Sequence, residues 1–297
     1  MTRLVVHADD VGMCHGANSA FVELSHHGGI TSGSVMVPCP WFPEIADLAS
    51  RDDRLDVGVH LTLNAEKEHY RWRPVSGVGK SSGLIDTDGY LWHRVADTRA
   101  SAHPEAVETE WRAQIDAALD AGIDVTHLDA HMGSALGPEW CDRYIKVGID
   151  YDVPVLITRT LSSYGPNNHL AGVDDADFDR FVVQAHAAGM PLFDEVLETD
   201  FSRPRDAPTS YEDMLTAPDV LAHDLVFCAF HPCAPGAGEI EVIEADTWHV
   251  RTDEHALFGT DEWLAFLDAQ AFELTTMKEL RADYRAARGS LTDASPA

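Results

Sequence analysis

The sequence predicts an α/β fold built from parallel βα units within one domain. Short runs of β-branched and other apolar residues alternate about seven times with amphipathic helical segments, and no break in composition divides the chain. The 297 residues suit one α/β barrel of ordinary size. No motif repeats with a solenoid period of roughly 20–50 residues. These observations leave two architectures, a closed barrel and an open, doubly wound sheet.

The first half of the chain contains four segments with the composition of buried strands, at 3–8, 31–37, 55–63 and 124–130. Amphipathic helices are predicted between them, at 16–27, 40–50 and 101–122. The first helix ends at Gly28-Gly29 and the third at Gly122, and Pro104 suits the first turn of the third. Residues 64–100 are irregular and rich in Gly, Ser and Pro, which indicates a functional loop or a lid.

The second half repeats the pattern less regularly. Strands are predicted at 153–158, 191–197 and 225–230, with a last short strand at 272–274. Helices are predicted at 139–147, 175–188, 211–221, 261–268 and 278–287. Gly148 is the expected stop of the first of these helices, and Thr260 is the expected N-cap of the fourth. We therefore expect one domain over 1–288 and a disordered tail over 289–297.

The charge balance excludes several classes of partner. The chain has 21 Lys and Arg against 50 Asp and Glu, a formal net charge of −29. Proteins bind nucleic acids and anionic membranes mainly through Lys and Arg, so we expect neither as a partner. No apolar run reaches the roughly 18 residues of a membrane span, and no signal peptide is expected at the N-terminus. Five scattered cysteines are typical of a reduced, cytoplasmic protein.

Groups with metal-binding or acid–base capacity follow the predicted strands at their carboxyl ends, where the active sites of α/β folds lie. The first strand ends in Asp9-Asp10, where a dinucleotide-binding fold would have a glycine-rich phosphate loop. Adjacent strand residues face opposite ways, so both aspartates can face one site only if the chain turns, which Gly12 permits. The alternative is a helix N-cap beside a solvated carboxylate.

The other candidates are histidines and one more aspartate. His127, Asp129 and His131 alternate along the fourth strand and share one face, which inside a barrel would be costly without partners. His60 lies near the end of the third strand, and His231 follows the strand at 225–230. The alternatives are an outward-facing polar strand for the first group, a hydrogen-bonded core histidine for His60 and a turn histidine for His231.

One carboxylate and two imidazoles would make a site with three protein ligands. Two nitrogen ligands suit Zn²⁺ or another first-row transition ion better than Mg²⁺. Three ligands leave positions for water and substrate, as in catalytic sites. A second aspartate can take a proton from water, and a histidine across the site can give one to a leaving group. This set of groups predicts hydrolysis of an amide or an ester.

The candidate residues lie in motifs that resemble, in order, those of the YdjC-like carbohydrate deacetylases, which include chitooligosaccharide deacetylases and a hopanoid-associated group. The motifs are Asp9-Asp10-x-Gly12, Gly29-Ile30-Thr31-Ser32, Gly58-x-His60-x-x-Leu63, Thr126-His127-Leu128-Asp129-x-His131 and His231-Pro232. The resemblance runs from residue 3 to about residue 235. It implies a distorted (β/α) barrel with about seven parallel strands, related to the polysaccharide deacetylases.

The resemblance also implies a reaction and a cofactor. The reaction is hydrolysis of an N-acetyl group on an amino sugar or oligosaccharide, with release of acetate. Asp10, His60 and His131 would bind one divalent metal ion, with Zn²⁺ favoured by the ligand chemistry and Mg²⁺ or Co²⁺ as alternatives. The partner is then a small N-acetylated sugar.

The remaining motif residues receive roles by the same carry-over. Asp9 would be the general base, and His231 would be the general acid for the departing amine. His127 and Asp129 match the motif and would orient the metal ligands or contact the substrate.

Other functions remain open beside N-deacetylation. The same groups could cleave a phosphoester or another amide, or a non-catalytic protein could bind sugar around a structural metal. Few bases lie near the motifs, which disfavours a phosphoester, and the paired Asp9-Asp10 disfavours a binding protein. Aromatic residues of the long loop either stack on sugar rings or pin the loop; they are Tyr70, Trp72, Tyr90 and Trp92. A homodimer is expected only because dimers are common among soluble proteins.

Overall fold

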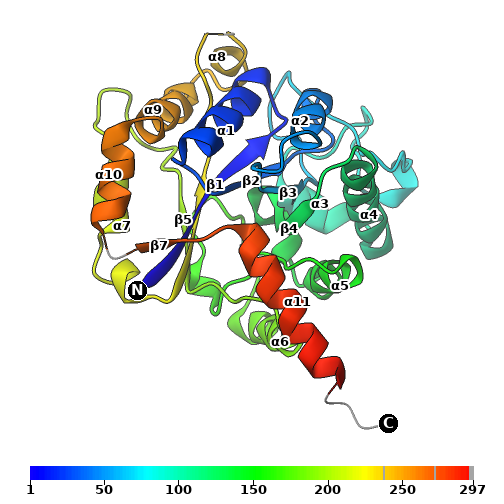
Figure 1. Ribbon diagram of the computed structural model, residues 1–297. Helices are drawn as coiled ribbons and strands as arrows, with labels where there is room; N and C mark the ends of the chain where they lie inside the picture. The colour runs from blue at the N-terminus through cyan, green and yellow to red at the C-terminus, as the bar shows by residue number, and fades with distance from the viewer. Residues whose placement is uncertain (237, 271, 294–297) are drawn as a thin grey trace.

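The computed structural model describes residues 1–236, 238–270 and 272–293 (Figure 1). Within these residues seven strands pair in parallel in one sheet, in the order β4-β3-β2-β1-β6-β5, with β7 also paired to β1. The predicted α/β fold of about seven parallel strands is confirmed. The strands are β1 (Thr2–Val11), β2 (Ser32–Val35), β3 (Val57–Leu61), β4 (Val125–Ala130), β5 (Glu195–Glu198), β6 (Leu225–Phe230) and β7 (Phe272–Leu274).

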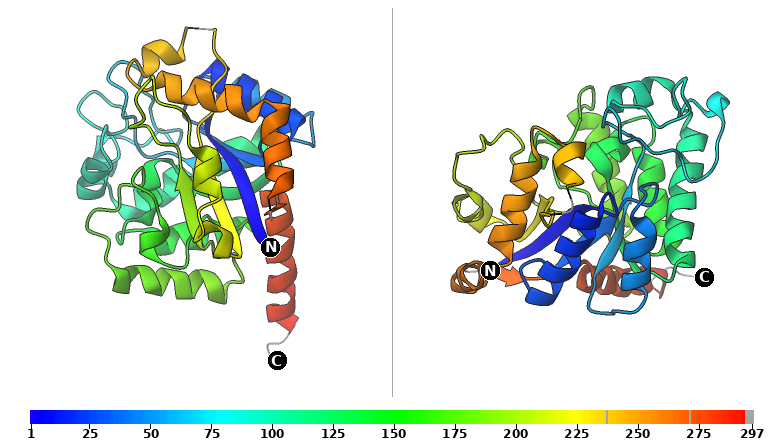
Figure 2. Two further views of the ribbon diagram at one scale, coloured as in Figure 1. Left: turned by 90° about the vertical axis from the view of Figure 1, so that its left-hand side faces the viewer. Right: turned by 90° about the horizontal axis from the view of Figure 1, so that it is seen from above.

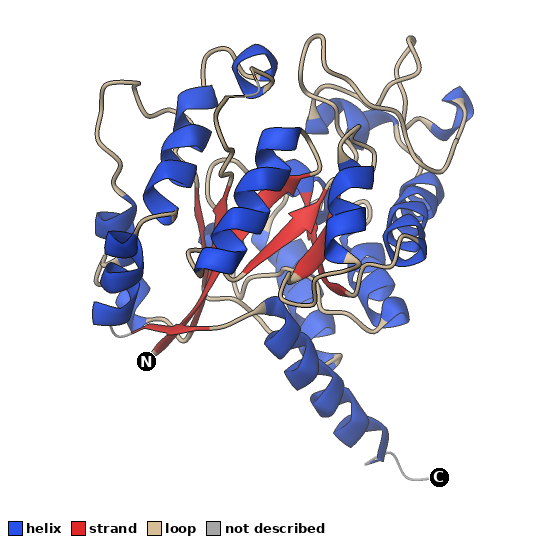
Figure 3. Ribbon diagram, turned by 45° about the horizontal axis from the view of Figure 1, so that its top comes forward, coloured by secondary structure: helices blue, strands red, loops and turns tan. Residues whose placement is uncertain are grey.

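Helices surround the sheet, which lies at the centre of the molecule (Figures 2 and 3). None of the helices in the described ranges is long and apolar enough to cross a membrane. The α-helices are α1 (His15–His27), α2 (Phe42–Ala49), α3 (Val95–Ser101), α4 (Pro104–Asp120), α5 (Cys141–Tyr151), α6 (Asp175–Ala187), α7 (Tyr211–Leu215), α8 (Ile240–Ile243), α9 (Trp248–Phe258), α10 (Asp261–Ala269) and α11 (Met277–Asp293). The 3-10 turns are η1 (Lys80–Ser82), η2 (His131–Leu136), η3 (Leu161–Ser163) and η4 (Val220–Ala222).

The segment 153–158 joins the two edge strands of the sheet and closes it into a distorted barrel. Val155 pairs in parallel with β4, and Thr158 pairs in parallel with Phe193, which lies just before β5. The segment makes only these isolated bridges and is not the regular strand predicted there. Pro154 is one reason, because it has no N–H to give to a ladder.

One predicted helix end is wrong and one helix was not predicted, both for reasons of packing. α5 continues through Gly148, its predicted stop, and ends where Asp152 adopts a left-handed conformation with φ of 57°. A Cβ at Gly148 would meet Val155 Cγ1 at 2.5 Å, so the close approach of helix and barrel requires the glycine. The sequence patterns also do not indicate α9, whose buried face is largely polar.

The ends of the last two helices can also be compared with the predictions. Thr260 caps α10 as predicted, because its side chain accepts a hydrogen bond from Trp263 N. α11 extends to Asp293, and residues 294–297 of the predicted tail lie outside the described residues. The assignment of 1–288 to a single domain stays a prediction.

The long segment 64–100 is tied to α4 by the buried carboxylate of Glu110. This carboxylate accepts hydrogen bonds from the backbone N–H groups of Val75 and Ser76, both at 2.9 Å, and from the Ser76 hydroxyl at 2.5 Å. Gln114, one turn further along α4, donates to it at 2.8 Å. The loop therefore has a fixed position over the barrel.

The aromatic residues of this segment bond to the protein itself. The indole N–H of Trp72 donates to Asn64 O, and that of Trp92 donates to Gly83 O, both at 2.8 Å. The phenol of Tyr70 donates to Met13 O at 2.5 Å. These contacts support the interpretation that the loop aromatics pin the loop.

Replacing Glu110 with alanine should lower the free energy of unfolding by about 3 kcal/mol, because buried N–H donors lose a charged acceptor. Urea unfolding followed by circular dichroism measures the change. Glu105→Ala removes an exposed carboxylate from the same helix and should change the free energy of unfolding by less than about 0.5 kcal/mol. Equal effects of the two substitutions would contradict the anchoring role of Glu110.

Candidate active site

The carboxyl ends of the strands converge on a cavity of about 260 Å³. Six of the seven residues singled out in the sequence line it, and His127 does not. The six are Asp9, Asp10, His60, Asp129, His131 and His231. These residues are spread over more than two hundred positions of the sequence, so it is the parallel barrel that brings them together.

Asp9 and Asp10 both face the cavity because β1 loses its regular geometry at Asp10. The register between β1 and β2 shifts between Ala8 and Val11, and Asp10 has a φ of 59°. The turn was expected at Gly12. It lies two residues earlier, at Asp10 itself. A non-glycine residue in this conformation is strained, and such strain is typical of functional sites.

One carboxylate oxygen of Asp10 lies close to both His60 and His131. Asp10 Oδ1 lies 3.2 Å from His131 Nδ1 and 3.5 Å from His60 Nε2, and all three side chains are buried. Within the described part of the chain, Oδ1 accepts no hydrogen bond. Their potential ligand atoms lie within 4.8 Å of one another, so the group could hold a metal ion.

The outer nitrogens of both histidines are held by carboxylates. His60 Nδ1 lies 3.0 Å from Asp129 Oδ2, which also accepts a hydrogen bond of 2.8 Å from the Ser34 hydroxyl. His131 Nε2 lies 2.9 Å from Glu66 Oε2. Carboxylate–histidine pairs of this kind orient the imidazole ligands of metal sites.

The second oxygen of Asp10 binds a buried cation. Arg251 Nη2, from α9, donates to Asp10 Oδ2 at 2.8 Å and to Glu244 Oε1 at 2.6 Å. Burial raises the pKa of Asp10, but Arg251 and His131 outweigh it and hold the pKa well below its usual range. Burial also raises the pKa of Glu244, and Arg251 with Lys67 lowers it to about 2. Both carboxylates are therefore ionised at neutral pH.

Lys67 and Glu66 complete a closed ring of alternating charges. Lys67 Nζ donates to Glu244 Oε1 at 2.6 Å and lies 3.0 Å from Glu66 Oε1. Burial lowers the pKa of His131, but Glu66 and Asp10 raise it to about 10. The ring runs through Asp10, Arg251, Glu244, Lys67, Glu66 and His131.

His231 follows β6 and faces the two aspartates. Its Nε2 lies 3.8 Å from Asp9 Oδ2 and 3.9 Å from Asp10 Oδ2. Its Nδ1 lies 2.8 Å from Thr199 Oγ1, which donates to Glu254 Oε1 at 2.6 Å. Because the hydroxyl gives its hydrogen to Glu254, it accepts one from Nδ1. Burial lowers the pKa of His231 to about 4, so the resting ring is neutral with its free lone pair at Nε2.

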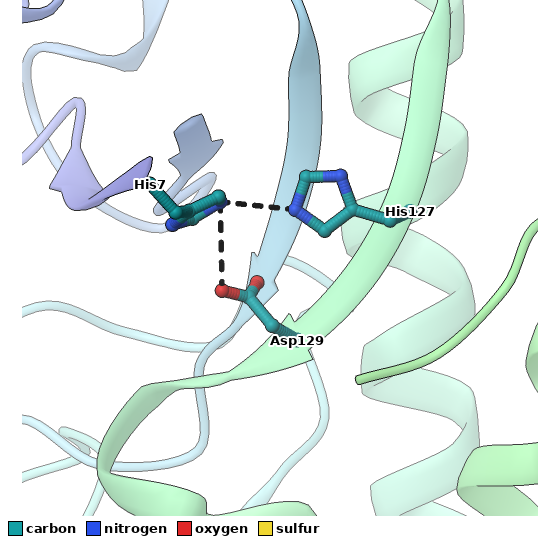
Figure 4. A group of neighbouring side chains, drawn as sticks. All are labelled: His7, His127 and Asp129. Carbon is teal, nitrogen blue, oxygen red and sulfur yellow. Dashed lines mark hydrogen bonds and ion pairs between the residues drawn. The ribbon is translucent and has the colours of Figure 1, made fainter. Parts of the chain in front are cut away.

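His127 lies behind the cavity and contacts another histidine (Figure 4). Its Nε2 is 3.0 Å from His7 Nε2, and His7 Nδ1 is 2.7 Å from Asp9 Oδ1. Asp129 Oδ2 lies 4.0 Å from His7 Nε2. His7, His127 and Asp129 are a second group that could hold a metal ion, although most of the ring nitrogens of the two histidines already take part in hydrogen bonds. Burial and His7 lower the pKa of His127 to about 3.

The charged residues that surround these groups were missed in the sequence. They lie on the long loop, at the end of α8 and on α9, where charged side chains are usually solvated. No spacing along the chain marks them, because each is paired with a residue from a distant segment. They are Glu66, Lys67, Glu244, Arg251 and Glu254.

Comparison with known proteins gives a consistent family. The family model described as YdjC-like protein matches residues 3–269. A carbohydrate deacetylase of Thermus thermophilus is 35% identical over 162 residues, which cover 54% of this chain and 56% of that protein. One of Brevibacillus brevis is 35% identical over 153 residues, covering 52% and 58%. The chain thus spans little more than half the length of the curated relatives it matches.

A solved structure has the same fold. It is a protein of Enterococcus faecalis V583 named for cellobiose-phosphate cleavage, with a TM-score of 0.73 and 19% sequence identity. The match covers 94% of this chain and 98% of the other. At this identity the likeness concerns the fold alone.

Glu254 should make the stability of the protein depend on pH. Burial raises its pKa from 4.5 to about 7, against the hydrogen bonds from Thr199, Tyr211 and His231 N. The folded chain keeps this proton where the unfolded chain has lost it. Stability from this group is therefore present below pH 4.5 and is lost as pH rises through about 7.

Urea unfolding of the wild type and of Glu254→Gln at several pH values between 5 and 8 tests this sign. The wild-type free energy of unfolding should fall relative to the variant by up to about 3 kcal/mol over this range. A chelator in all samples removes the pH dependence of metal binding. Parallel profiles of the two proteins would contradict the raised pKa.

Proposed function

The chain belongs to the YdjC-like protein family, and we propose that it hydrolyses an N-acetyl group on an amino sugar or oligosaccharide and releases acetate. One observation carries this proposal. Asp10, His60 and His131, which could hold a metal ion, line the same cavity as a second carboxylate, Asp9, and a neutral imidazole, His231. The names of the curated relatives support an acetylated sugar as substrate.

We propose that Asp10, His60 and His131 hold one divalent metal ion. Two observations support the fit: the buried Asp10 Oδ1 accepts no hydrogen bond within the described ranges, and both histidines are oriented from behind by carboxylates. A bound ion would polarise the acetyl carbonyl and stabilise the negative charge that develops on its oxygen. The two nitrogen ligands favour Zn²⁺ over Mg²⁺, with Co²⁺ as an alternative. Because His131 must lose its proton to bind, metal affinity should rise with pH.

Asp9 is suited to accept the proton of the attacking water. Its Oδ1 is occupied by His7, whereas its Oδ2 faces His231 Nε2 at 3.8 Å and His60 Nε2 at 4.0 Å. Because His231 is neutral at rest, it must gain a proton during turnover before it can protonate the departing amine. Because 3.8 Å exceeds a direct hydrogen bond, the proton that Asp9 Oδ2 removes from water would pass to His231 Nε2, and from there to the amine, through one bridging water.

Other residues that line the same cavity offer contacts for the sugar. Phe201 lies with its ring 4.9 Å from the His231 ring, and the Arg251 guanidinium lies 5.1 Å from the Phe201 ring. Glu198 accepts a hydrogen bond of 2.7 Å from Asn167 N and another from Asn168 Nδ2. We propose that Phe201 packs against the sugar ring and that Glu198 accepts hydrogen bonds from its hydroxyls.

The structure also bears on the phosphoester alternative. Two bases absent from the motifs, Arg251 and Lys67, do line the cavity. Both are already bound to carboxylates, Arg251 to Asp10 and Glu244 and Lys67 to Glu244 and Glu66. Their charge is therefore neutralised, and an N-acetyl group, which carries no charge, fits this cavity better than a phosphate.

The direct test combines metal analysis with a product assay. Elemental mass spectrometry gives the metal content of the purified protein. Acetate release is measured on a panel of N-acetylated mono- and oligosaccharides with Zn²⁺, Co²⁺ or Mg²⁺ added. We expect about one metal per chain and acetate release from at least one sugar. Metal without acetate would favour another hydrolysis, and a protein that binds none of the three ions would contradict the ligand assignment.

Asp9→Asn should lower kcat by about 10²–10⁴-fold and leave metal content unchanged, because it removes a base and no metal ligand. Asp10→Asn is the matched variant and should lose both metal and activity. The readouts are acetate release and elemental analysis. If Asp9→Asn retains wild-type turnover, Asp9 is not the base, and if it loses the metal, Asp9 is a ligand.

Phe201→Ala should raise KM about 10-fold with a small change in kcat, because it removes the proposed contact with the sugar ring. Tyr90→Ala is the control. Tyr90 is not among the residues that line the cavity, and its ring contacts the Arg71 and Arg73 guanidinium groups, so its loss should leave KM unchanged. A rise in KM for Tyr90→Ala alone would instead support the loop aromatics as sugar contacts.

A further inference from the structure

A chain of hydrogen bonds leads away from Asp9 through the barrel interior. His7 Nδ1 lies 2.7 Å from Asp9 Oδ1, and His7 Nε2 lies 3.0 Å from His127 Nε2, the contact drawn in Figure 4. His127 Nδ1 lies 2.9 Å from Thr126 Oγ1, which donates to Asp56 Oδ1 at 2.5 Å. His7, Thr126 and His127 are completely buried, so water does not compete for these bonds. Asp56 precedes β3, at the amino end of the barrel.

The far end of this chain decides the direction of its hydrogen bonds. Asp56 Oδ2 accepts a hydrogen bond of 2.6 Å from Lys278 N in the first turn of α11, where a negative charge is favoured. Burial raises the pKa of Asp56 above its ordinary value and outweighs the hydrogen bonds from the Thr126 hydroxyl and Lys278 N–H, so the direction of the chain rests on these two hydrogen bonds and not on the acidity of Asp56. Thr126 gives its only hydrogen to Asp56 and must therefore accept one from His127 Nδ1.

Each later bond follows from the one before it. A neutral imidazole has one hydrogen, so His127, with its hydrogen at Nδ1, presents a lone pair at Nε2. His7 must then donate through its own Nε2. Its Nδ1 faces a carboxylate oxygen at 2.7 Å, and two acceptors cannot approach so closely without a proton between them. His7 and Asp9 therefore share one proton.

We infer that His7 is the positioning residue of Asp9: it holds Asp9 Oδ1 through this shared proton and leaves Oδ2 as the atom that acts on water. The inference rests on the proposed role of Asp9 as the base. It also gives His127 a function, because the lone pair of His127 orients His7. Neither residue contacts the cavity directly in this arrangement.

The tautomer of His127 tests the direction of the chain without any activity assay. Long-range ¹H–¹⁵N correlation spectra of the purified, ¹⁵N-histidine-labelled protein report which ring nitrogen is protonated, and the spectrum of His127→Gln assigns the signal. We expect the hydrogen at Nδ1. A hydrogen at Nε2 would mean that the chain runs in reverse from a protonated Asp56, with neutral His7 donating to Asp9, and would overturn the shared proton.

Kinetics of two His7 variants test the positioning role. His7→Leu removes the donor to Asp9 and should lower kcat about 100-fold with KM and metal content unchanged. His7→Asn places an amide N–H near the former Nδ1 and should recover at least 10-fold of that loss. A purely structural role predicts instead that both variants lose thermal stability and metal together and that Asn rescues nothing.

The two tests separate failure of this inference from failure of the proposed function. If the wild type releases no acetate from any sugar, the proposed function fails, while the tautomer experiment still gives a result. If the wild type is active and His7→Leu has the same kcat, the positioning role is wrong. The assignment of Asp9 as the base is then decided by the Asp9→Asn variant alone.

Discussion

The carboxylate of Asp10 is the point at which three distant parts of the chain are held together. Its Oδ1 faces His131 and His60 at the ends of the barrel strands, and its Oδ2 binds Arg251 from α9. Through Glu244, Lys67 and Glu66 the same ring of charges returns to His131 by way of the long loop. Buried charges are costly unless they are paired, so removal of one member leaves its neighbours uncompensated.

The two carboxylate oxygens of Asp10 have different partners and therefore different roles. Arg251 occupies Oδ2, which leaves Oδ1 as the oxygen available to a metal ion beside the two imidazoles. The same division appears at Asp9, where His7 occupies one oxygen and the other faces the cavity. Each carboxylate is thus oriented by a partner on one side, which is how a rigid site places its reactive atoms before a substrate arrives.

Much of the fold follows from patterns that are local in the sequence. The strands at 225–230 and 272–274 and the cap at Thr260 lie where the sequence predicts them. The patterns fail where burial is polar or where packing overrides propensity. α9 buries His249, Arg251, Thr252 and Glu254, so no apolar stripe marks it. Gly148 was predicted to end its helix, but α5 continues through it. The glycine is needed there because a side chain at this position would collide with Val155.

The sequence by itself determined the class of fold, the seven candidate residues and the chemistry that carboxylates and imidazoles can perform together. The end of a buried strand can be recognised in a sequence because its stretch of apolar residues gives way to polar ones. Polar residues at the carboxyl ends of parallel strands lie together at one end of the barrel. Only the tertiary structure decided which oxygen or nitrogen faces which. It left His127 out of the lining of the cavity, brought Arg251 to Asp10 and Lys67 to Glu66 and Glu244, and put the turn at Asp10. These features depend on contacts between segments far apart in the chain, and no local pattern of residues encodes such contacts.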